Sequence, residues 1–187
     1  MRARGFSQPV PGPVKAVRRT SRALAATACR WHSRRMSSTA SHLAITALIH
    51  AYAERLDAGD FAGVGALFAH ATYRSSRGGA YRGADEVAAV LERLVLLHAD
   101  GTPRTKHVIT NLTIEVDDAA GTATARSYFT VLQQTERVPL QIVVAGRYHD
   151  RFERADGAWR FADRLIYGDL LGTLTDHLRD SSGLARS

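Results

Sequence analysis

The feature that most constrains the fold is a change in the spacing of apolar residues near Gly101 and Pro103. Before this point, apolar side chains recur every three or four residues, which is typical of helices that pack on a core. After it, apolar and polar residues alternate, which is typical of strands. Helices first and strands second favour the α+β class over an alternating α/β fold. The length of 187 residues suits one domain with a substantial core.

Three helices are predicted in the first half of the chain. Ser41 is a candidate N-cap for the first helix, which Gly59 ends, and Asp60 is a candidate N-cap for the second. The predicted segments are a helix over 41–58, a helix over 61–68, a short strand over 71–75, a turn at 78–79 and a helix over 84–98.

Four long strands are predicted in the second half, with turn residues such as Asp118, Gly121 and Gly157 between them. A weak helix is expected after Gly168. Helices over one face of a strongly bent antiparallel sheet leave a concave cavity, which is a common ligand site. The predicted strands are 105–116, 122–134, 140–154 and 159–167.

The positive charge is concentrated at the N-terminus. The formal net charge is +7, but residues 1–41 hold nine of the 25 cations, and the first acidic residue is Glu54. We expect a disordered basic leader over 1–40, a folded domain over 41–178 and a flexible tail over 179–187. Three explanations of the leader remain open: a start wrongly placed before Met36, a mitochondrial transit segment, or a basic binding arm.

Several classes of protein are excluded by what the sequence lacks. It has no run of 18 apolar residues, no glycine-rich nucleotide loop, no Gly-x-Ser-x-Gly and no His-Glu-x-x-His. Its single cysteine, Cys29, excludes an internal disulfide framework. We therefore expect a cytoplasmic protein with no cofactor, no bound metal, no nucleic-acid partner and no membrane partner.

Five segments resemble a known family by their order and spacing. The chain is similar to the SnoaL-like branch of the nuclear transport factor 2-like superfamily, and in pattern to its scytalone dehydratase-like members, over about 42–178. The segments are Tyr52-Ala-Glu-Arg-Leu-Asp57-Ala-Gly-Asp60, Tyr73-Arg-Ser75, Arg104-Thr-Lys-His107-Val-Ile-Thr-Asn111, Gly146-Arg-Tyr148-His-Asp150 and Asp156-Gly-Ala-Trp159-Arg-Phe161.

The resemblance implies a cone-shaped, curved antiparallel or mixed sheet around a pocket, covered by three N-terminal helices. It also implies an acid–base pair made by Asp57 and His107, with Tyr73 holding a substrate carbonyl. Two departures from the scytalone dehydratase pattern stand out. The position of a second tyrosine is occupied by Leu56. The position of a second catalytic histidine falls near Leu132 or Gln133, neither of which is a base.

The candidate pair has a physical rationale and a structural alternative. Asp57 lies at the negative end of its helix dipole, so a cation such as a protonated His107 or Arg164 is expected to compensate it. In the alternative, Asp57 only ties the helix end to an arginine or to a backbone amide. Strand alternation predicts that His107, Ile109 and Asn111 face the same side of the sheet.

We therefore expect a proton-transfer enzyme, of the dehydratase, cyclase or isomerase type, that acts on a small hydrophobic oxygenated molecule. The alternatives are a non-catalytic ligand-binding domain and an oligomerisation domain, since one fold serves many functions. The expected assembly is a homo-oligomer, a dimer or a trimer. Asp57 and His107 are the candidate catalytic residues, and the candidate substrate-binding residues are Tyr52, Tyr73, Asn111, Tyr128, Tyr148 and Tyr167.

Overall fold

The computed structural model describes the backbone of residues 21–179, and the side chains from residue 38 onward. The chain divides into two units, Met1–Met36 and Ser37–Ser187. In the first unit, residues 21–36 are helical. Residues 1–20 of the predicted leader and residues 180–187 of the predicted tail lie outside the described residues. No helix in the described part of the chain is both long enough and apolar enough to cross a bilayer.

Helices precede the long strands, as the change in apolar spacing predicts. A short hairpin, β1 and β2, lies between the second and third helices. The described elements are α1 (Ser21–Asp57), α2 (Phe61–Leu67), β1 (Thr72–Ser75), β2 (Ala80–Arg82), α3 (Gly83–Leu94), β3 (Thr105–Asp117), β4 (Thr122–Gln133), β5 (Gln141–Ala155) and β6 (Ala158–Leu171).

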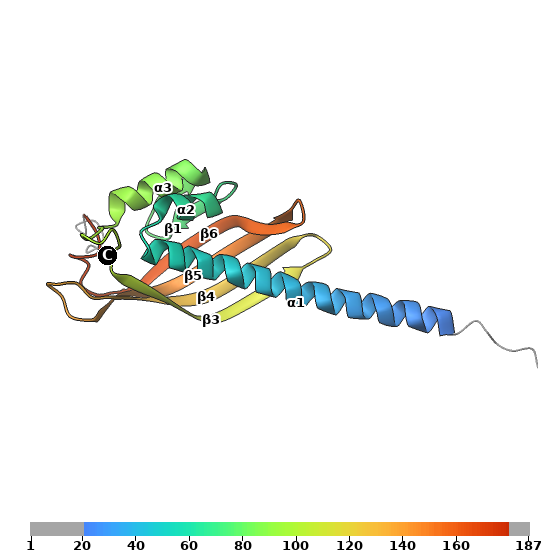
Figure 1. The fold of residues 1–187 in the computed structure, drawn as a ribbon. Coiled ribbons are helices and arrows are strands. Elements are labelled where there is room, and N and C mark those ends of the chain that lie inside the picture. The colour runs from blue at the N-terminus through green and yellow to red at the C-terminus, as the bar shows by residue number, and fades with distance from the viewer. Residues whose placement is uncertain (1–20, 180–187) are drawn as a thin grey trace, which may run out of the picture. The chain divides into compact units, whose positions relative to one another are not determined.

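All six strands form one sheet in the order β2-β1-β6-β5-β4-β3. β1 pairs with β6 in parallel, whereas the other neighbouring strands are antiparallel. The four long strands lie side by side in a curved layer (Figure 1). The α+β class is therefore confirmed: three helices accompany a mixed sheet that does not close into a barrel.

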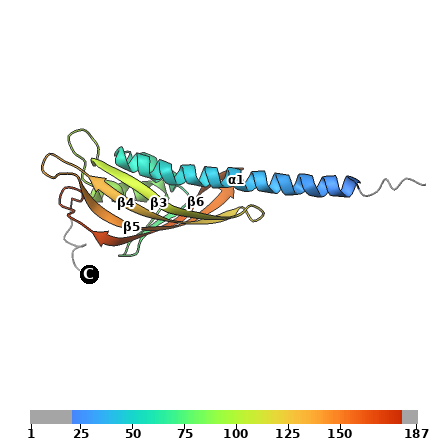
Figure 2. The ribbon, with the colours of Figure 1, turned by 90° about the horizontal axis from the view of Figure 1, so that it is seen from below.

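The part of α1 from residue 37 onward lies along one face of this sheet (Figure 2), and α2 and α3 pack on the same core. We call this face the inner face and the other the outer face. Exposed and buried side chains alternate along β4, from exposed Thr122 to buried Gln133. This alternation assigns each residue of β4 to one of the two faces. Odd-numbered residues of β4 point inward, and even-numbered ones point outward.

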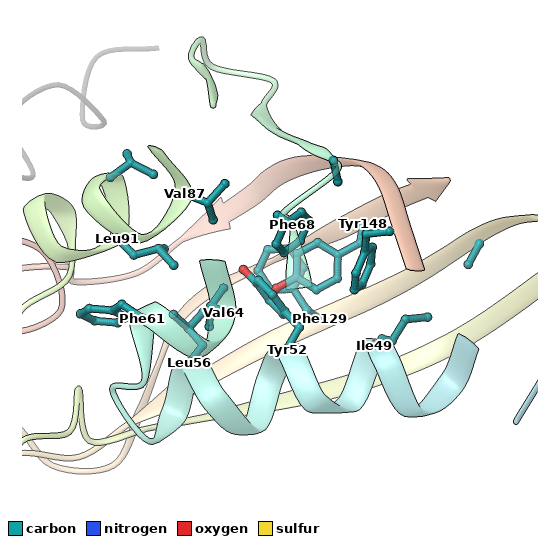
Figure 3. Packing of buried hydrophobic residues seen from close by; sticks show 14 of the residues in the cluster. Ile49, Tyr52, Leu56, Phe61, Val64, Phe68, Val87, Leu91, Phe129 and Tyr148 are labelled. Carbon is teal, nitrogen blue, oxygen red and sulfur yellow. The ribbon is translucent and has the colours of Figure 1, made fainter. Parts of the chain in front are cut away.

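Aromatic rings form the centre of the core between α1 and the inner face (Figure 3). Tyr52 of α1 meets Tyr148 of β5 edge to face, with ring centroids 5.8 Å apart. Tyr148 in turn stacks on Phe129 of β4 at 4.3 Å. Such pairs add to the free energy gained by burying the rings, and they fix the separation of helix and sheet. Trp159 and Phe161 are buried, as expected for core residues.

Four features of the fold differ from the sequence-based prediction. α1 begins at Ser21 rather than at Ser41, because residues 21–40 contain no proline or glycine to interrupt it. Ser41 is therefore not an N-cap, and its hydroxyl donates to Asp118 Oδ1. The short strand β2 was not predicted, and α3 ends at Leu94 rather than His98. The weak helix expected after Gly168 is the end of β6 followed by a turn.

A β-bulge interrupts the alternation of β3. The pairing with β4 shifts between Thr110 and Thr113, and Asn111 has a φ of 51°. Thr110 and Asn111 are therefore both exposed, and Leu112 instead of Asn111 returns to the inner side. The expectation that Asn111 shares a face with His107 is wrong, because a bulge inserts one residue and reverses the phase of all later side chains.

Candidate functional site

The C-terminal end of α1 is held against the loop that leads into β3. Gly59 ends the helix with a φ of 76°, and its amide donates to the carbonyl of Leu56 at 3.1 Å. A Cβ at Gly59 would collide with the carbonyl oxygen of Gly101. This close approach brings the last residue of α1, Asp57, to the first residues of β3.

Asp57 and His107 meet there, as the candidate pair requires. Asp57 Oδ1 lies 2.6 Å from His107 Nδ1, and Oδ2 accepts the backbone N–H of His107 at 2.8 Å. The hydroxyl of Thr105 donates to Oδ1 at 2.7 Å. The carboxylate thus holds His107 by both its ring and its backbone, which fixes the orientation of the imidazole.

The pair is buried. The side chains of His107 and Asp57 are only 5% and 9% exposed. Burial raises the pKa of Asp57, but the hydrogen bonds and charge of His107 and the hydroxyl of Thr105 outweigh it, so this pKa lies below its usual value. Asp57 is therefore ionised at neutral pH, and a neutral His107 carries its proton on Nδ1.

This tautomer leaves the other ring nitrogen of His107 as a base. Nε2 makes no hydrogen bond to any of the residues that the structure describes. His107 is paired in the sheet with Val131, and the neighbouring pair is Ile109 with Phe129. An apolar surface beside an oriented imidazole suits the removal of a proton from a carbon atom of a hydrophobic ligand.

Three of the six candidate binding residues come together next to Phe68 and Phe129. The hydroxyls of Tyr52 and Tyr73 lie 3.0 Å apart, and Tyr148 packs against the Tyr52 ring. Burial raises the pKa of Tyr73 and of Tyr148 well above the usual value for a phenol. These hydroxyls therefore stay protonated and are able to donate to a ligand oxygen at any physiological pH.

A buried arginine stands among these tyrosines. Arg164 is fully buried and forms two hydrogen bonds with Asp150, at 2.7 and 2.8 Å. Its guanidinium carbon lies 4.2 Å from the ring centroid of Tyr52 and 4.1 Å from that of Tyr148. Arg164 thus compensates Asp150, and not Asp57 as considered above. Its Nη1 is buried and has no partner among the described residues.

Sequence reasoning considered Arg164 only as a partner of Asp57 and missed its pairing with Asp150, although a signal was present. The residues two positions to either side of Asp150 and of Arg164 are apolar, and charges in such surroundings are buried only in pairs. The partnership itself depends on the register between β5 and β6, in which Asp150 is opposite Arg164. No local pattern predicts that register, because a bulge between Arg151 and Phe152 shifts it.

The other three candidate binding residues lie away from the pair. Asn111 is exposed at the bulge, and Tyr128 is 52% exposed on the outer face. Tyr167 is paired with Arg147 on the same outer face, and the guanidinium of Arg147 covers its ring at 4.7 Å. The structure therefore brings Tyr52, Tyr73 and Tyr148 together and leaves these three outside the inner layer.

Three surface hollows of the described chain lie elsewhere. The first adjoins Gly59 and Arg179, the second adjoins His98 and Asp176, and the third lies over the ends of β3, β4 and β5. None of the three is lined by Asp57 or His107.

One family model matches most of the chain. The model of the SnoaL-like domain matches residues 37–165. This region begins within α1 and ends within β6. Both members of the candidate pair lie within the matched region. No curated protein matches the sequence significantly.

Solved structures share the fold. A protein of unknown function from Mycobacterium tuberculosis is 26% identical, with a TM-score of 0.60, covering 78% of this chain and 81% of that one. An NTF2-like protein with a cystatin-like fold from Novosphingobium aromaticivorans is 20% identical, with a TM-score of 0.62 and coverages of 77% and 91%. A proposed scytalone dehydratase from the same organism is 22% identical, with a TM-score of 0.60 and coverages of 74% and 90%.

Proposed function

Because this chain belongs to the family of SnoaL-like domains, we propose that it is a cofactor-independent enzyme that transfers a proton on a small hydrophobic oxygenated molecule. The observation that carries the proposal is the contact between Asp57 and His107, in which a buried carboxylate fixes the imidazole tautomer.

The proposed step is the removal of a proton from the carbon next to a carbonyl. His107 Nε2 takes the proton, the C–H electrons form a carbon–carbon double bond, and the carbonyl π electrons move to oxygen. The resulting imidazolium is stabilised by Asp57 at 2.6 Å. It then returns the proton to carbon, or gives it to a leaving hydroxyl, so isomerisation, cyclisation and dehydration share this first step.

The negative charge that develops on the carbonyl oxygen of the substrate needs a hydrogen-bond donor to stabilise it. The buried hydroxyls of Tyr52 and Tyr73, 3.0 Å apart, are candidates for this role, together with the unpartnered Nη1 of Arg164. Donors that are already oriented lower such barriers more than water does. A flat, mostly apolar ketone suits the surrounding aromatic rings.

Proton exchange in heavy water tests the proposal directly. The full chain is incubated with 2-tetralone or 4-chromanone in D2O, and loss of the α-proton signals is followed by NMR. We expect exchange faster than in buffer, and a decrease of about 10²- to 10⁴-fold in the variant His107→Ala. His70→Ala, which removes an exposed histidine, is the matched control and should exchange like the wild type.

Two results would contradict the proposal. One is exchange of both ketones at the buffer rate. The other is exchange that is the same in the wild type and in His107→Ala, because the base would then lie elsewhere.

A non-catalytic, self-associating domain is the second candidate function, and one observation favours it. Large apolar side chains are exposed on the outer face of the sheet, among them Tyr128 at 52% and Ile142 at 56%. We propose that this face joins copies of the chain into a dimer or a trimer, whether or not the inner face is catalytic.

A further inference from the structure

The last described segment of the chain, residues 172–179, docks beside the catalytic candidates. The backbone N–H of Leu96 donates to the carbonyl of His177 at 2.9 Å. Gln133 Nε2 donates to the carbonyl of Asp176 at 3.0 Å and to that of Pro103 at 2.9 Å. Since Gln133 pairs with Thr105 in the sheet, these bonds tie the segment to the start of β3.

A second anchor lies one residue before His177. The carboxylate of Asp176 accepts the hydroxyl of Thr135 at 2.8 Å and the guanidinium of Arg137 at 2.6 Å. Together with His98, these residues line a hollow of about 200 Å³. The segment is therefore anchored both to Gln133 of β4 and to the turn that follows β4.

His177 is a buried group that the proposed proton transfer does not use. Its Nδ1 is buried and has no hydrogen-bond partner in the described part of the chain. Burial, followed by the charge of His107, lowers the pKa of His177 to about 4, against the opposing charge of Asp57. The imidazole is therefore neutral at physiological pH. Gln133 binds the carbonyl just before His177 and pairs with Thr105, which donates to Asp57, so the segment that carries His177 lies at the same end of β3 as the pair.

An unpartnered buried nitrogen calls for an explanation. Leaving a polar atom buried without a hydrogen bond costs about 1–3 kcal/mol, and folded proteins usually avoid this cost. A metal does not explain it, because within residues 38–179 no three histidine, cysteine, aspartate or glutamate side chains cluster as a metal site requires. A ligand oxygen next to His107 would supply the missing partner.

We propose that His177 is a third polar residue of the candidate active site, and that its Nδ1 hydrogen-bonds the carbonyl or hydroxyl oxygen of the ligand held at His107. This inference rests on the proposed function and extends it to the C-terminal segment. His177 contacts the ligand as a neutral donor or acceptor, whereas His107 takes the proton. This hydrogen bond favours the binding of ligands that carry an oxygen at this position over the binding of hydrocarbons without one.

Binding of 2-naphthol tests this contact without requiring turnover. This planar phenol resembles the enol of 2-tetralone, and its fluorescence reports its affinity. In the full chain with ¹⁵N-labelled histidines, we expect the ring signals of both His107 and His177 to move when 2-naphthol is added. The signals of His70, which is exposed, should not move.

Two substitutions separate the contact from a structural role. His177→Asn keeps a polar atom near the position of Nδ1, and His177→Leu removes it. We expect His177→Leu to bind 2-naphthol about tenfold more weakly, which corresponds to one hydrogen bond, and His177→Asn to bind nearly as the wild type does. Circular dichroism establishes that both variants fold, and His70→Leu is the control for a histidine loss elsewhere.

The outcomes distinguish this inference from the proposed function. If 2-naphthol moves the His107 signals but not those of His177, or binds His177→Leu as tightly as the wild type, the inference is wrong and the proposed function stands. If neither histidine responds and the ketones exchange at the buffer rate, both are wrong.

Discussion

Asp57 carries its charge because His107 and Thr105 stabilise the ionised form. A carboxyl group with a lowered pKa in the folded state stabilises the protein above the pKa of the unfolded chain, and this contribution is lost as pH falls through the folded value. The stabilisation by Asp57 is therefore complete near neutral pH and is lost below about pH 4.

The variant Asp57→Asn tests this linkage. At pH 7 it loses charge-assisted hydrogen bonds to His107 and Thr105, so we expect its free energy of unfolding to fall by about 1–3 kcal/mol. Urea titrations from pH 7 to pH 3 should show the difference from the wild type shrinking as the pH falls. A difference that is constant over this range would contradict the assignment.

His177 also makes the protein less stable in acid, but over a higher pH range than Asp57 does. Its folded pKa of about 4 lies below the value of about 6.5 in an unfolded chain, so the unfolded state binds more protons between these values. Stability therefore decreases as the pH falls from 6.5 to 4, by up to about 3 kcal/mol.

The variant His177→Leu should lose this acid sensitivity. We expect the difference in free energy of unfolding, variant minus wild type, to be more positive at pH 4.5 than at pH 7.5, because only the wild type is destabilised by protonation of His177. Urea unfolding at the two pH values gives the comparison, with His70→Leu as a control. Equal changes in wild type and His177→Leu would show that His177 is protonated as easily as an exposed histidine.

At the scale of elements, the junction between α1 and the loop before β3 decides whether Asp57 reaches His107. Gly59 is needed there for two reasons, a φ of 76° and the approach of the Gly101 carbonyl. Gly157 has a similar φ of 81° but no neighbour within contact distance of an added Cβ.

Comparison of Gly59→Ala with Gly157→Ala isolates the close approach. Both variants carry the strain of an alanine at positive φ, which we expect to cost about 1 kcal/mol. Gly59→Ala should cost at least about 1 kcal/mol more, because helix and loop must move apart. It should also slow ketone exchange, whereas Gly157→Ala should not. Equal losses of stability would contradict the role of the helix–loop contact.

The bulge at Asn111 is the second decisive element, because it sets which residues of β3 face inward. Asn111 is one of the few residue types that tolerate a φ of 51°. We expect Asn111→Gly to keep or raise the free energy of unfolding by up to about 1 kcal/mol, and Asn111→Val to lower it by more than about 1 kcal/mol.

Ketone exchange by Asn111→Gly provides the functional readout. Because Asn111 is exposed, we expect the exchange rate to equal that of the wild type. A large decrease with unchanged stability would mean that the asparagine side chain contacts the ligand after all.

At the scale of the whole molecule, the two faces of the sheet have different proposed roles. The inner face carries the Asp57–His107 pair and the aromatic core. The outer face carries the exposed apolar side chains of Tyr128 and Ile142. Assembly through the outer face would leave the inner face free.

Light scattering of the full chain tests the assembly. We expect a dimer or a trimer for the wild type, and a monomer for the double variant Tyr128→Glu, Ile142→Glu, because buried carboxylates would oppose association. Leu43→Glu changes an apolar residue of α1 that is 67% exposed and serves as the control. A monomeric wild type would contradict the proposed assembly.

The sequence by itself determined the order of the three helices and of every strand except β2, and several of their ends, because these depend on local periodicity and turn residues. Asp60 is the N-cap of α2 as predicted, accepting from the amide of Gly63. The starts of β3 and β4 also fall at the predicted residues, Thr105 and Thr122. The pairing of Asp57 with His107 followed from the resemblance of the motifs to a known family.

Only the tertiary structure decided which side chains meet. The bulge moved Asn111 outward, the register of two strands joined Asp150 to Arg164, and backbone hydrogen bonds docked residues 172–179 on Leu96 and Gln133. These outcomes depend on contacts between residues far apart in the chain. The spacing of neighbouring residues carries no information about such contacts, since it reflects only the local conformation of the backbone.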